Sequence, residues 1–206
     1  RNYLKVYCSS ILNSVDGVPT LIRKETFKLK VLIMEKKLKI SKRQEGQEIV
    51  YIFENYLSKR ECQKWRSTIP DLGVGEFDWS LRARDITQEP VVSKLQKFLN
   101  KKFKLNLQIS QAQTQNWNQT SFSELHVHDI PRNVRRSSYS SSIYLNDDFK
   151  GGRFFTKNGI KIKPKVGLLT FFNGTTVWHG VEHVQGKDRK ALIFFWAKPN
   201  LDWAEK

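Results

Sequence analysis

The stretch that decides the fold is residues 160–174, with the sequence IKIKPKVGLLTFFNG. Ile160 and Ile162 alternate with lysines, a mostly apolar run follows at 168–172, and Asn173-Gly174 is a turn pair. Alternation, and short apolar runs that end at turn residues, are typical of β-strands. Residues 108–117 alternate in the same way, and residues 142–145 and 191–196 are further strand-like runs. The C-terminal half of the chain is therefore predicted to consist of strands joined by turns.

Two helix signals precede these strands. Ser58 and Glu61 form a capping box, in which the two side chains satisfy free backbone amides at the start of a helix. That helix must end before Pro70. Pro90 suits the first turn of a second helix, whose apolar stripe consists of Val91, Leu95, Phe98 and Leu99. Two helices followed by antiparallel strands predict an α+β, mainly β fold, a sandwich or jelly roll supported by N-terminal helices.

The first part of the chain differs from the rest. Phe27, Leu29 and Val31 alternate as in a strand, and basic residues are dense between Arg23 and Arg43. We therefore interpret residues 1–46 as a β-rich basic N-terminal extension and residues 47–206 as the principal domain. No run of about 18 apolar residues exists, so no membrane-spanning helix is expected.

The overall composition indicates which kinds of partner the protein can bind. The net charge of +16 over 206 residues favours an anionic partner: nucleic acid, a membrane surface or an acidic polypeptide. The competing interpretation is a solvated basic surface that keeps the protein in solution. The only cysteines, Cys8 and Cys62, are too few for a disulfide framework and favour a reducing compartment such as the cytoplasm.

All four histidines fall in two clusters, His126-Val127-His128 and the pair His179 and His183. On a strand, residues i and i+2 share a face, so His126 and His128 can point at one metal ion. A strand some fifty residues later can bring His179 to the same ion. We interpret His183 as a surface histidine or a neighbour of the site rather than a ligand.

Several ordered stretches carry a resemblance to a known family. They are residues 53–58 with Glu61-Cys62, residues 142–152 (SIYLNDDFKGG), residues 162–172 (IKPKVGLLTFF), and the segment from His179-Gly180-Val181 through Arg189 to Trp196. Together they resemble the prolyl hydroxylases of the iron(II)/2-oxoglutarate dioxygenase superfamily, over roughly residues 48–200. Residues 1–46 lie outside the resemblance, so the domain of this type is 47–206.

The resemblance implies a fold, cofactors and roles. The fold is a double-stranded β-helix, the cofactors are Fe(II) and 2-oxoglutarate, and ascorbate is admitted as an accessory. His126 and His179 are implied as iron ligands, and Arg189 and Tyr144 as the residues that hold the remote carboxylate of 2-oxoglutarate. The implied activity is hydroxylation of a polypeptide, at a prolyl residue. Trp117 is a candidate aromatic wall of the pocket.

One position departs from the family pattern. The family's motif is H-x-D, whereas this chain has His128 at the third position, followed by Asp129. His128 can replace the carboxylate as the third ligand, or Asp129 can reach the metal through a β-bulge. The remaining alternative is a degraded site. A regular strand would point Asp129 away from His126, which favours His128 as the occupant of the ligand position.

Four functions therefore remain open at the level of sequence. The first is the iron- and 2-oxoglutarate-dependent hydroxylase of a protein substrate. The second is a catalytically impaired binding module with the same fold, supported by the missing carboxylate. The third is an oxygenase that acts on nucleic acid, supported by the charge. A cupin-like metal protein is the fourth, but cupins add a glutamate shortly after the histidine pair, and residues 129–133 contain none.

Overall fold

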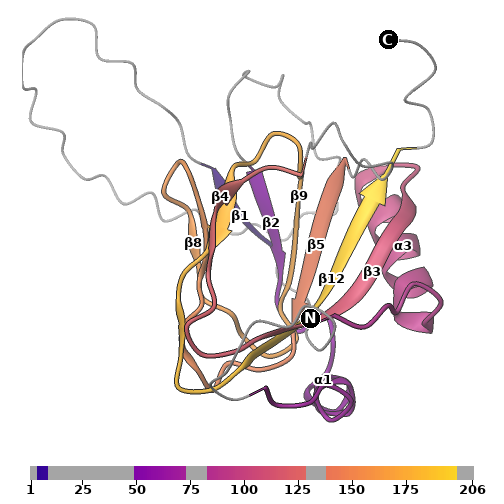
Figure 1. The fold of residues 1–206 in the computed structure, drawn as a ribbon. Coiled ribbons are helices and arrows are strands. Elements are labelled where there is room, and N and C mark those ends of the chain that lie inside the picture. Colours follow the sequence, from indigo (N-terminus) through magenta and orange to yellow (C-terminus); the bar gives the residue numbers. More distant parts are fainter. Residues whose placement is uncertain (1–3, 9–48, 73–82, 129–137, 199–206) are drawn as a thin grey trace, which may run out of the picture.

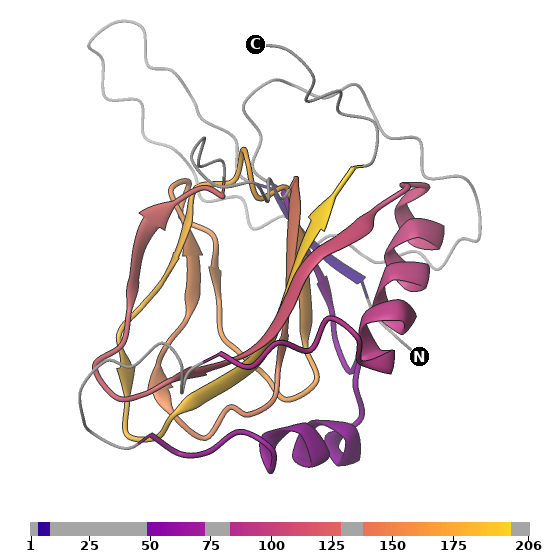
Figure 2. The same cartoon turned by 45° about the vertical axis from the view of Figure 1, so that its right-hand side comes forward.

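The computed structural model describes residues 4–8, 49–72, 83–128 and 138–198. Two antiparallel sheets face each other in this part of the chain, as in a jelly roll (Figure 2). The larger sheet has the strand order β1-β2-β9-β5-β12-β3, and the smaller one has the order β4-β10-β7-β8. A two-stranded ribbon, β11-β6, completes the sheets. The prediction of a mainly β fold with antiparallel sheets is therefore confirmed.

The larger sheet is built from β1 (Leu4–Cys8), β2 (Ile49–Phe53), β9 (Leu169–Phe172), β5 (Tyr139–Tyr144), β12 (Arg189–Ala197) and β3 (Gln108–Trp117). The smaller sheet is built from β4 (Ser123–His126), β10 (His179–Val181), β7 (Phe154–Thr156) and β8 (Lys161–Ile162). The ribbon consists of β6 (Lys150–Gly151) and β11 (Val184–Gln185). β8 is shorter than the alternation from Ile160 predicts, since Gly159 has a φ of +86° and Pro164 cannot donate to a ladder.

Alternation along β12 divides the interior into two cores. Leu192, Phe194 and Trp196 belong to the core on the helix side of the larger sheet, whereas Ala191 and Ile193 belong to the core between the sheets. Successive side chains of a strand point to opposite faces, so β12 contributes to both cores at once. This near-continuous apolar run is what its burial on both faces requires.

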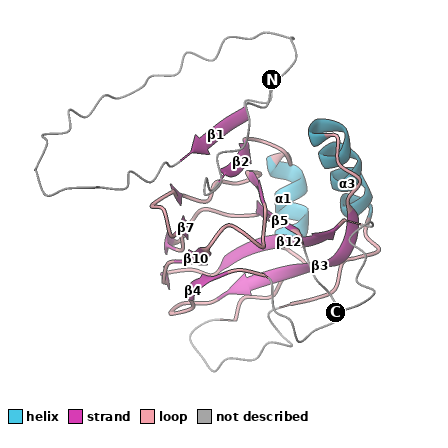
Figure 3. Ribbon diagram, turned by 90° about the horizontal axis from the view of Figure 1, so that it is seen from above, coloured by secondary structure: helices cyan, strands magenta, loops and turns pink. Residues whose placement is uncertain are grey.

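The helix α3 (Pro90–Phe103) lies on the side of the larger sheet away from the smaller one, and α1 (Lys59–Arg66) lies below the lower ends of the strands (Figures 1 and 3). The capping box of α1 is present, with Ser58 and Glu61 bonded reciprocally. α3 begins at Pro90, as predicted, and buries Val91, Val92, Leu95 and Leu99. Each of these fully buried aliphatic side chains contributes roughly 1.5–3 kcal/mol. Neither described helix is long and apolar enough to cross a membrane.

The basic residues divide between described and undescribed parts. The dense stretch from Arg23 to Arg43, and the strand expected around Phe27, lie outside the described residues. A second basic stretch, from Lys94 to Lys104, lies on the exposed side of α3 and at its end, and Lys94 pairs with Glu61 at 3.1 Å. A solvated helix face accounts for these lysines without a partner.

Candidate metal centre and anion pocket

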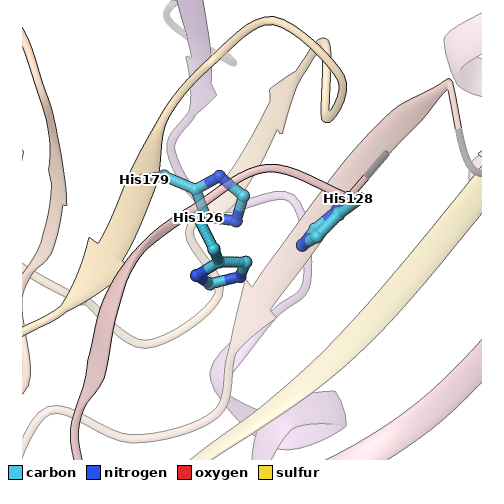
Figure 4. Close-up of side chains that lie close together, drawn as sticks. All are labelled: His126, His128 and His179. Atoms are coloured by element: carbon cyan, nitrogen blue, oxygen red, sulfur yellow. The ribbon is translucent and has the colours of Figure 1, made fainter. Parts of the chain in front are cut away.

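Three histidines from separate parts of the fold converge on one space (Figure 4). His126 at the end of β4 is the cross-strand partner of His179 on β10, so the two side chains share the inward face of the smaller sheet. His128 follows β4, and its backbone N–H donates to the carbonyl of Gly174 at 2.9 Å. One ligand atom from each imidazole lies within 4.8 Å of the other two. The spacing can therefore hold a single metal ion.

The second nitrogen of each imidazole has a partner of its own. Nδ1 of His126 lies 2.9 Å from the carbonyl of Glu124, and Nδ1 of His179 lies 2.9 Å from the carbonyl of Val177. A carbonyl can only accept, so both Nδ1 atoms carry the proton and both Nε2 atoms keep a lone pair. Nδ1 of His128 lies 2.6 Å from the Ser140 hydroxyl. Partners of this kind fix the ring orientation that a metal ligand needs.

The two inner histidines are neutral at neutral pH. Burial, followed by the influence of the neighbouring His126, lowers the pKa of His128 to about 4. Burial, followed by the influence of His128, lowers the pKa of His179 to about 3. Aromatic rings enclose them: Phe172 lies 4.6 Å from the ring of His179, and Phe195 lies 5.1 Å from that of His128. A neutral imidazole in dry surroundings is the form that binds a metal.

His128 occupies a space shaped for an imidazole. A Cβ atom on Gly174 would lie 2.9 Å from Nδ1 of His128 and 2.9 Å from Oγ of Ser140. Any larger residue at position 174 would therefore displace this pair. Ser140 and Gly174 were not predicted as parts of the site. The Asn173-Gly174 turn was visible in the sequence, but its closeness to His128 was not.

Arg189 is buried between two aromatic rings on the inward face of the larger sheet. Its side chain is only 2% exposed, and its Cζ lies 5.0 Å from the Tyr144 ring centroid and 5.6 Å from that of Trp117. Burial lowers the pKa of Arg189. Its Nε and Nη1 atoms, and the hydroxyl of Tyr144, are buried without a hydrogen-bond partner among the described residues.

These unpaired groups form a candidate anion site, here called the anion pocket. Buried polar atoms are rarely left unpaired in native proteins, and a buried cation without a counter-charge is costly. A guanidinium beside a phenol hydroxyl presents donors that match a carboxylate. The residues thus fit a ligand that carries a carboxylate, and the sequence had singled out both Arg189 and Tyr144.

The other candidates from the sequence lie elsewhere. His183 is exposed and does not belong to the histidine cluster; its ring lies 4.3 Å from that of Phe122, tilted by 33°. Asp129, the alternative ligand, lies outside the described residues. Trp117 contacts Arg189 rather than the histidines, and its indole donates to Gln115 at 2.9 Å. Among the described residues, no carboxylate joins the cluster.

A separate cavity of about 1030 Å³ lies between α1 and the loops around Leu145 and Pro164. Its lining includes Lys59, Arg66, Lys163 and Lys190 but none of the three clustered histidines. The cavity is therefore distinct from the metal centre.

Comparison with known proteins finds a family model that matches part of the chain. The model of the 2OG-Fe(II) oxygenase superfamily matches residues 112–198, which include the three histidines, Tyr144 and Arg189. Human Prolyl 3-hydroxylase 2 is 40% identical over 65 residues, which make up 28% of this chain. The match spans only 9% of the length of that relative.

Solved structures share the fold at low sequence identity. The viral collagen prolyl hydroxylase of Paramecium Bursaria Chlorella virus-1 has a TM-score of 0.55 and 16% identity, covering 72% of this chain and 95% of that one. A Pseudomonas putida prolyl-4-hydroxylase has a TM-score of 0.51 and 17% identity, covering 72% and 92%. HygX of Streptomyces hygroscopicus, solved with nickel and 2-oxoglutarate, has a TM-score of 0.55 and 12% identity, covering 73% and 82%. The chain is therefore similar to the 2OG-Fe(II) oxygenase superfamily over residues 112–198, and it shares its fold with solved prolyl hydroxylases.

Proposed function

We propose that this domain is an Fe(II)- and 2-oxoglutarate-dependent oxygenase that hydroxylates a polypeptide, at a prolyl residue. The observation that carries the proposal is the pairing of two sites inside one fold. Three imidazoles with fixed rings can hold Fe(II), and an unpaired buried guanidinium can hold a carboxylate. The prolyl substrate rests on the relatives alone, since three of them are prolyl hydroxylases by name.

Each residue has a defined task in this proposal. His126, His128 and His179 hold the metal. The carbonyl partners of His126 and His179 keep their Nε2 lone pairs free for it, and the Ser140 hydroxyl holds the His128 ring in place. Arg189 and Tyr144 bind and orient the remote carboxylate. Phe172 and Phe195 keep water away from the inner imidazoles. When bound, Fe(II) with 2-oxoglutarate and O₂ supplies the oxidising chemistry, and ascorbate serves as an accessory reductant.

The helices complete the proposed architecture. α3 covers the outer side of the larger sheet and α1 lies below the lower ends of the strands (Figure 1), and apolar residues of both helices join the same core as Leu192 and Phe194. We assign them the role of supporting the double-stranded β-helix, so that the inner face of the sheet keeps its shape.

The all-histidine ligand set favours a second candidate, a non-catalytic binding module. Three neutral ligands leave the metal with one negative charge less than two histidines and a carboxylate would. The hydrogen bond between His128 and Ser140 and the close packing of Gly174 against both support a histidine at this position, which is why we place the active oxygenase first. The nucleic-acid alternative rests only on the net charge of +16, and binding that weakens steeply with salt would favour it.

An anaerobic titration separates the two leading candidates. Fe(II) and then 2-oxoglutarate are added to the full chain while the visible charge-transfer band of the chelate is followed, and succinate is measured after oxygen is admitted with a proline-containing peptide. We expect the band and succinate in the unmodified protein and neither in His179→Ala. The matched control is His183→Ala, which removes an exposed histidine outside the cluster and should leave both signals unchanged.

His128→Asp decides the remaining question. If the unmodified protein gives neither band nor succinate while His128→Asp gives both, the domain is an impaired module and His128 is the cause of the impairment. If neither protein gives a band, the active oxygenase is wrong, and so is a module that binds Fe(II) with 2-oxoglutarate.

A further inference from the structure

A group of buried polar side chains lies directly behind Arg189, on the opposite face of β12. Asp188 is 7% exposed, Lys190 is 4% exposed, and Asn116 and Asn146 are each 1% exposed. Alternation places Asp188 and Lys190 on the face away from Arg189. No residue of this group is a candidate metal or carboxylate ligand, so their burial needs another explanation.

Asp188 ties the start of β12 to the segment that follows α1. Its Oδ2 accepts from the backbone N–H of Leu72 at 2.7 Å and from Nδ2 of Asn116 at 2.9 Å. The same Asn116 amide donates to the carbonyl of Pro70 at 2.6 Å. A single carboxylate oxygen therefore holds β3 and residues 70–72 together, and buried charge-assisted hydrogen bonds of this type are among the stronger ones.

Lys190 repeats the connection two residues further on. Its Nζ donates to the carbonyl of Ile69 at 2.5 Å and pairs with Oδ1 of Asp71 at 2.7 Å. Residues 69–72 are therefore bonded both to the residue before Arg189 and to the residue after it.

Asn146 brackets the backbone of Arg189 from the other strand. The ladder between β12 and β5 runs from Ala191, which pairs with Tyr144, and one more backbone bond joins the Leu145 N–H to the Lys190 carbonyl at 2.9 Å. Beyond that point the Asn146 side chain continues the pattern: Oδ1 accepts from Lys190 N at 2.8 Å and Nδ2 donates to the carbonyl of Asp188 at 2.8 Å. The Asn146 amide therefore makes the hydrogen bonds that the backbone of a neighbouring strand would make, with the residue before Arg189 and the residue after it.

This bracket matters because Arg189 is the first residue of β12. Strand ends fray more readily than strand interiors, and no acidic partner among the described residues fixes the guanidinium. A displacement of about 1 Å is enough to lose much of a binding geometry. The position of the guanidinium therefore depends on how firmly its backbone is held.

We propose that Asp188, with Asn146 and Lys190, is a positioning clamp that fixes the Arg189 backbone and thereby sets the affinity of the anion pocket for the remote carboxylate of 2-oxoglutarate. The inference rests on the proposed function. Residues 69–72, which follow α1, are then coupled to the anion pocket through the clamp and not by contact with the ligand.

The test measures the dissociation constants of Fe(II) and of 2-oxoglutarate separately, by anaerobic titration of the full chain. Asp188→Ala should raise the dissociation constant of 2-oxoglutarate roughly tenfold or more, as loss of a supporting partner commonly does. The affinity for Fe(II) alone should stay within about twofold, because the three histidines lie on other strands. Asp188→Asn, which keeps an acceptor for Leu72 and Asn116, should restore most of the 2-oxoglutarate affinity.

Asn100→Ala is the matched control for lost stability. Asn100 also makes two side-chain bonds to the backbone, both partly buried and both to Leu107, at 3.1 and 2.8 Å, but it lies near the end of α3. We expect this variant to lower the melting temperature without changing the affinity for 2-oxoglutarate. Lys190→Met, which keeps the aliphatic stem, provides a second test of the clamp if Asp188→Ala does not fold.

The outcomes are distinguishable. Unchanged 2-oxoglutarate affinity in folded Asp188→Ala or Lys190→Met overturns the clamp and leaves the proposed function standing. A parallel loss of Fe(II) and 2-oxoglutarate affinity, or an equal loss in Asn100→Ala, also overturns it, since either would mark a general structural effect. No binding of 2-oxoglutarate by the unmodified protein overturns the proposed function and the clamp with it.

Discussion

Arg189 is a residue whose burial costs stability in the absence of a ligand. Its guanidinium lies between the rings of Tyr144 and Trp117, and two of its nitrogens lack a partner among the described residues. A desolvated charge without a counter-charge is unfavourable by several kcal/mol, of which stacking on aromatic rings returns about 1–2 kcal/mol. The proposed carboxylate ligand would supply the counter-charge that the described residues do not.

This asymmetry predicts that Arg189→Met stabilises the ligand-free protein. We expect a gain of about 1–2 kcal/mol, since apolar groups of similar volume often improve on buried charges. The melting temperature should rise by about 2–4 °C per kcal/mol for a chain of this size. The same variant should lose the additional rise that Fe(II) with 2-oxoglutarate gives the unmodified protein. Differential scanning calorimetry measures both effects.

Arg153→Met is the control for this prediction. Arg153 is exposed and pairs with Glu182 at 2.5 Å on the surface. Its substitution should change the melting temperature little and should leave the ligand-dependent rise intact. A destabilised Arg189→Met would contradict the assignment of Arg189 as an unpaired buried cation.

At the scale of elements, one turn joins the first helix to the sheet that carries Tyr144. Gly167 has a φ of +78° and its carbonyl accepts from the backbone N–H groups of Tyr56 and Leu57 at 2.8 and 3.3 Å. Its own N–H donates to the carbonyl of Tyr144 at 2.8 Å. A Cβ at this position would lie 2.1 Å from the carbonyl oxygen of Leu57. The close approach of the two segments therefore requires glycine.

Two glycine substitutions separate backbone strain from steric conflict. Gly159 also has a positive φ, of +86°, but nothing lies within 4 Å of a Cβ placed there. Gly159→Ala should cost about 1 kcal/mol, the price of the left-handed conformation alone. Gly167→Ala should cost at least about 2–3 kcal/mol more, as overpacking adds to that term. Urea unfolding of the two variants checks the difference, and equal losses would show that the turn can relax.

Local signals predicted the elements well. The capping box at Ser58, the helix start at Pro90 and the alternation of residues 108–117 each encode their structure within a few neighbouring residues, and α1, α3 and β3 confirm them. The two-residue period also predicted that His126 and His128 could approach one ion, and the structure brings both to His179. Their role as ligands stays a prediction.

The supporting residues could not be predicted in this way. Asp188 bonds to Leu72 across 116 positions of the chain, and Ser140 meets His128 from another strand. The two-residue period of a strand predicts which face of the sheet a residue occupies, but not which polar groups meet on that face. Such contacts depend on register and loop lengths. The division between residues 1–46 and 47–206 likewise stays a prediction.

At the scale of the whole molecule, shifted carboxylates and the excess of positive charge act together. Burial alone would raise the pKa of Asp148, but hydrogen bonds from Asn146, Arg66 and Lys187 outweigh it and hold that pKa below its usual value. The same direction holds for Asp71, bonded to Lys190, and for Glu182, bonded to Arg153. All three carboxylates join separate segments of the fold.

These shifts predict a loss of stability in acid. A carboxylate whose pKa is lower in the folded state adds stability above its unfolded-state pKa of about 4. That contribution is lost as the pH falls through the folded-state pKa. Protonation also increases the net charge beyond +16, which adds repulsion. The urea midpoint should therefore be steady near pH 7 and fall steeply below about pH 4.

Asp148→Asn and Asp147→Asn form the matched pair for this measurement. Asp148 bonds to Arg66 and Lys187, whereas the exposed Asp147 forms no ion pair that the described structure shows. Asp148→Asn should lose less stability than the unmodified protein between pH 7 and pH 3, by on the order of 0.5–1 kcal/mol. Asp147→Asn should lose as much as the unmodified protein. Identical acid profiles for the two variants would rule out Asp148 as a contributor.

The alternation of Asp188, Arg189 and Lys190 also makes the length of β12 a constraint on evolution. Insertion or deletion of one residue within Arg189–Ala197 would move the preceding residues of the strand to the opposite face. The guanidinium of Arg189 would then turn outward, and the buried charges of Asp188 and Lys190 would turn inward. The preceding turn at Gly186 has open space around it and can absorb a change in length. Relatives that keep this arginine should therefore vary in length before position 188 and not after it.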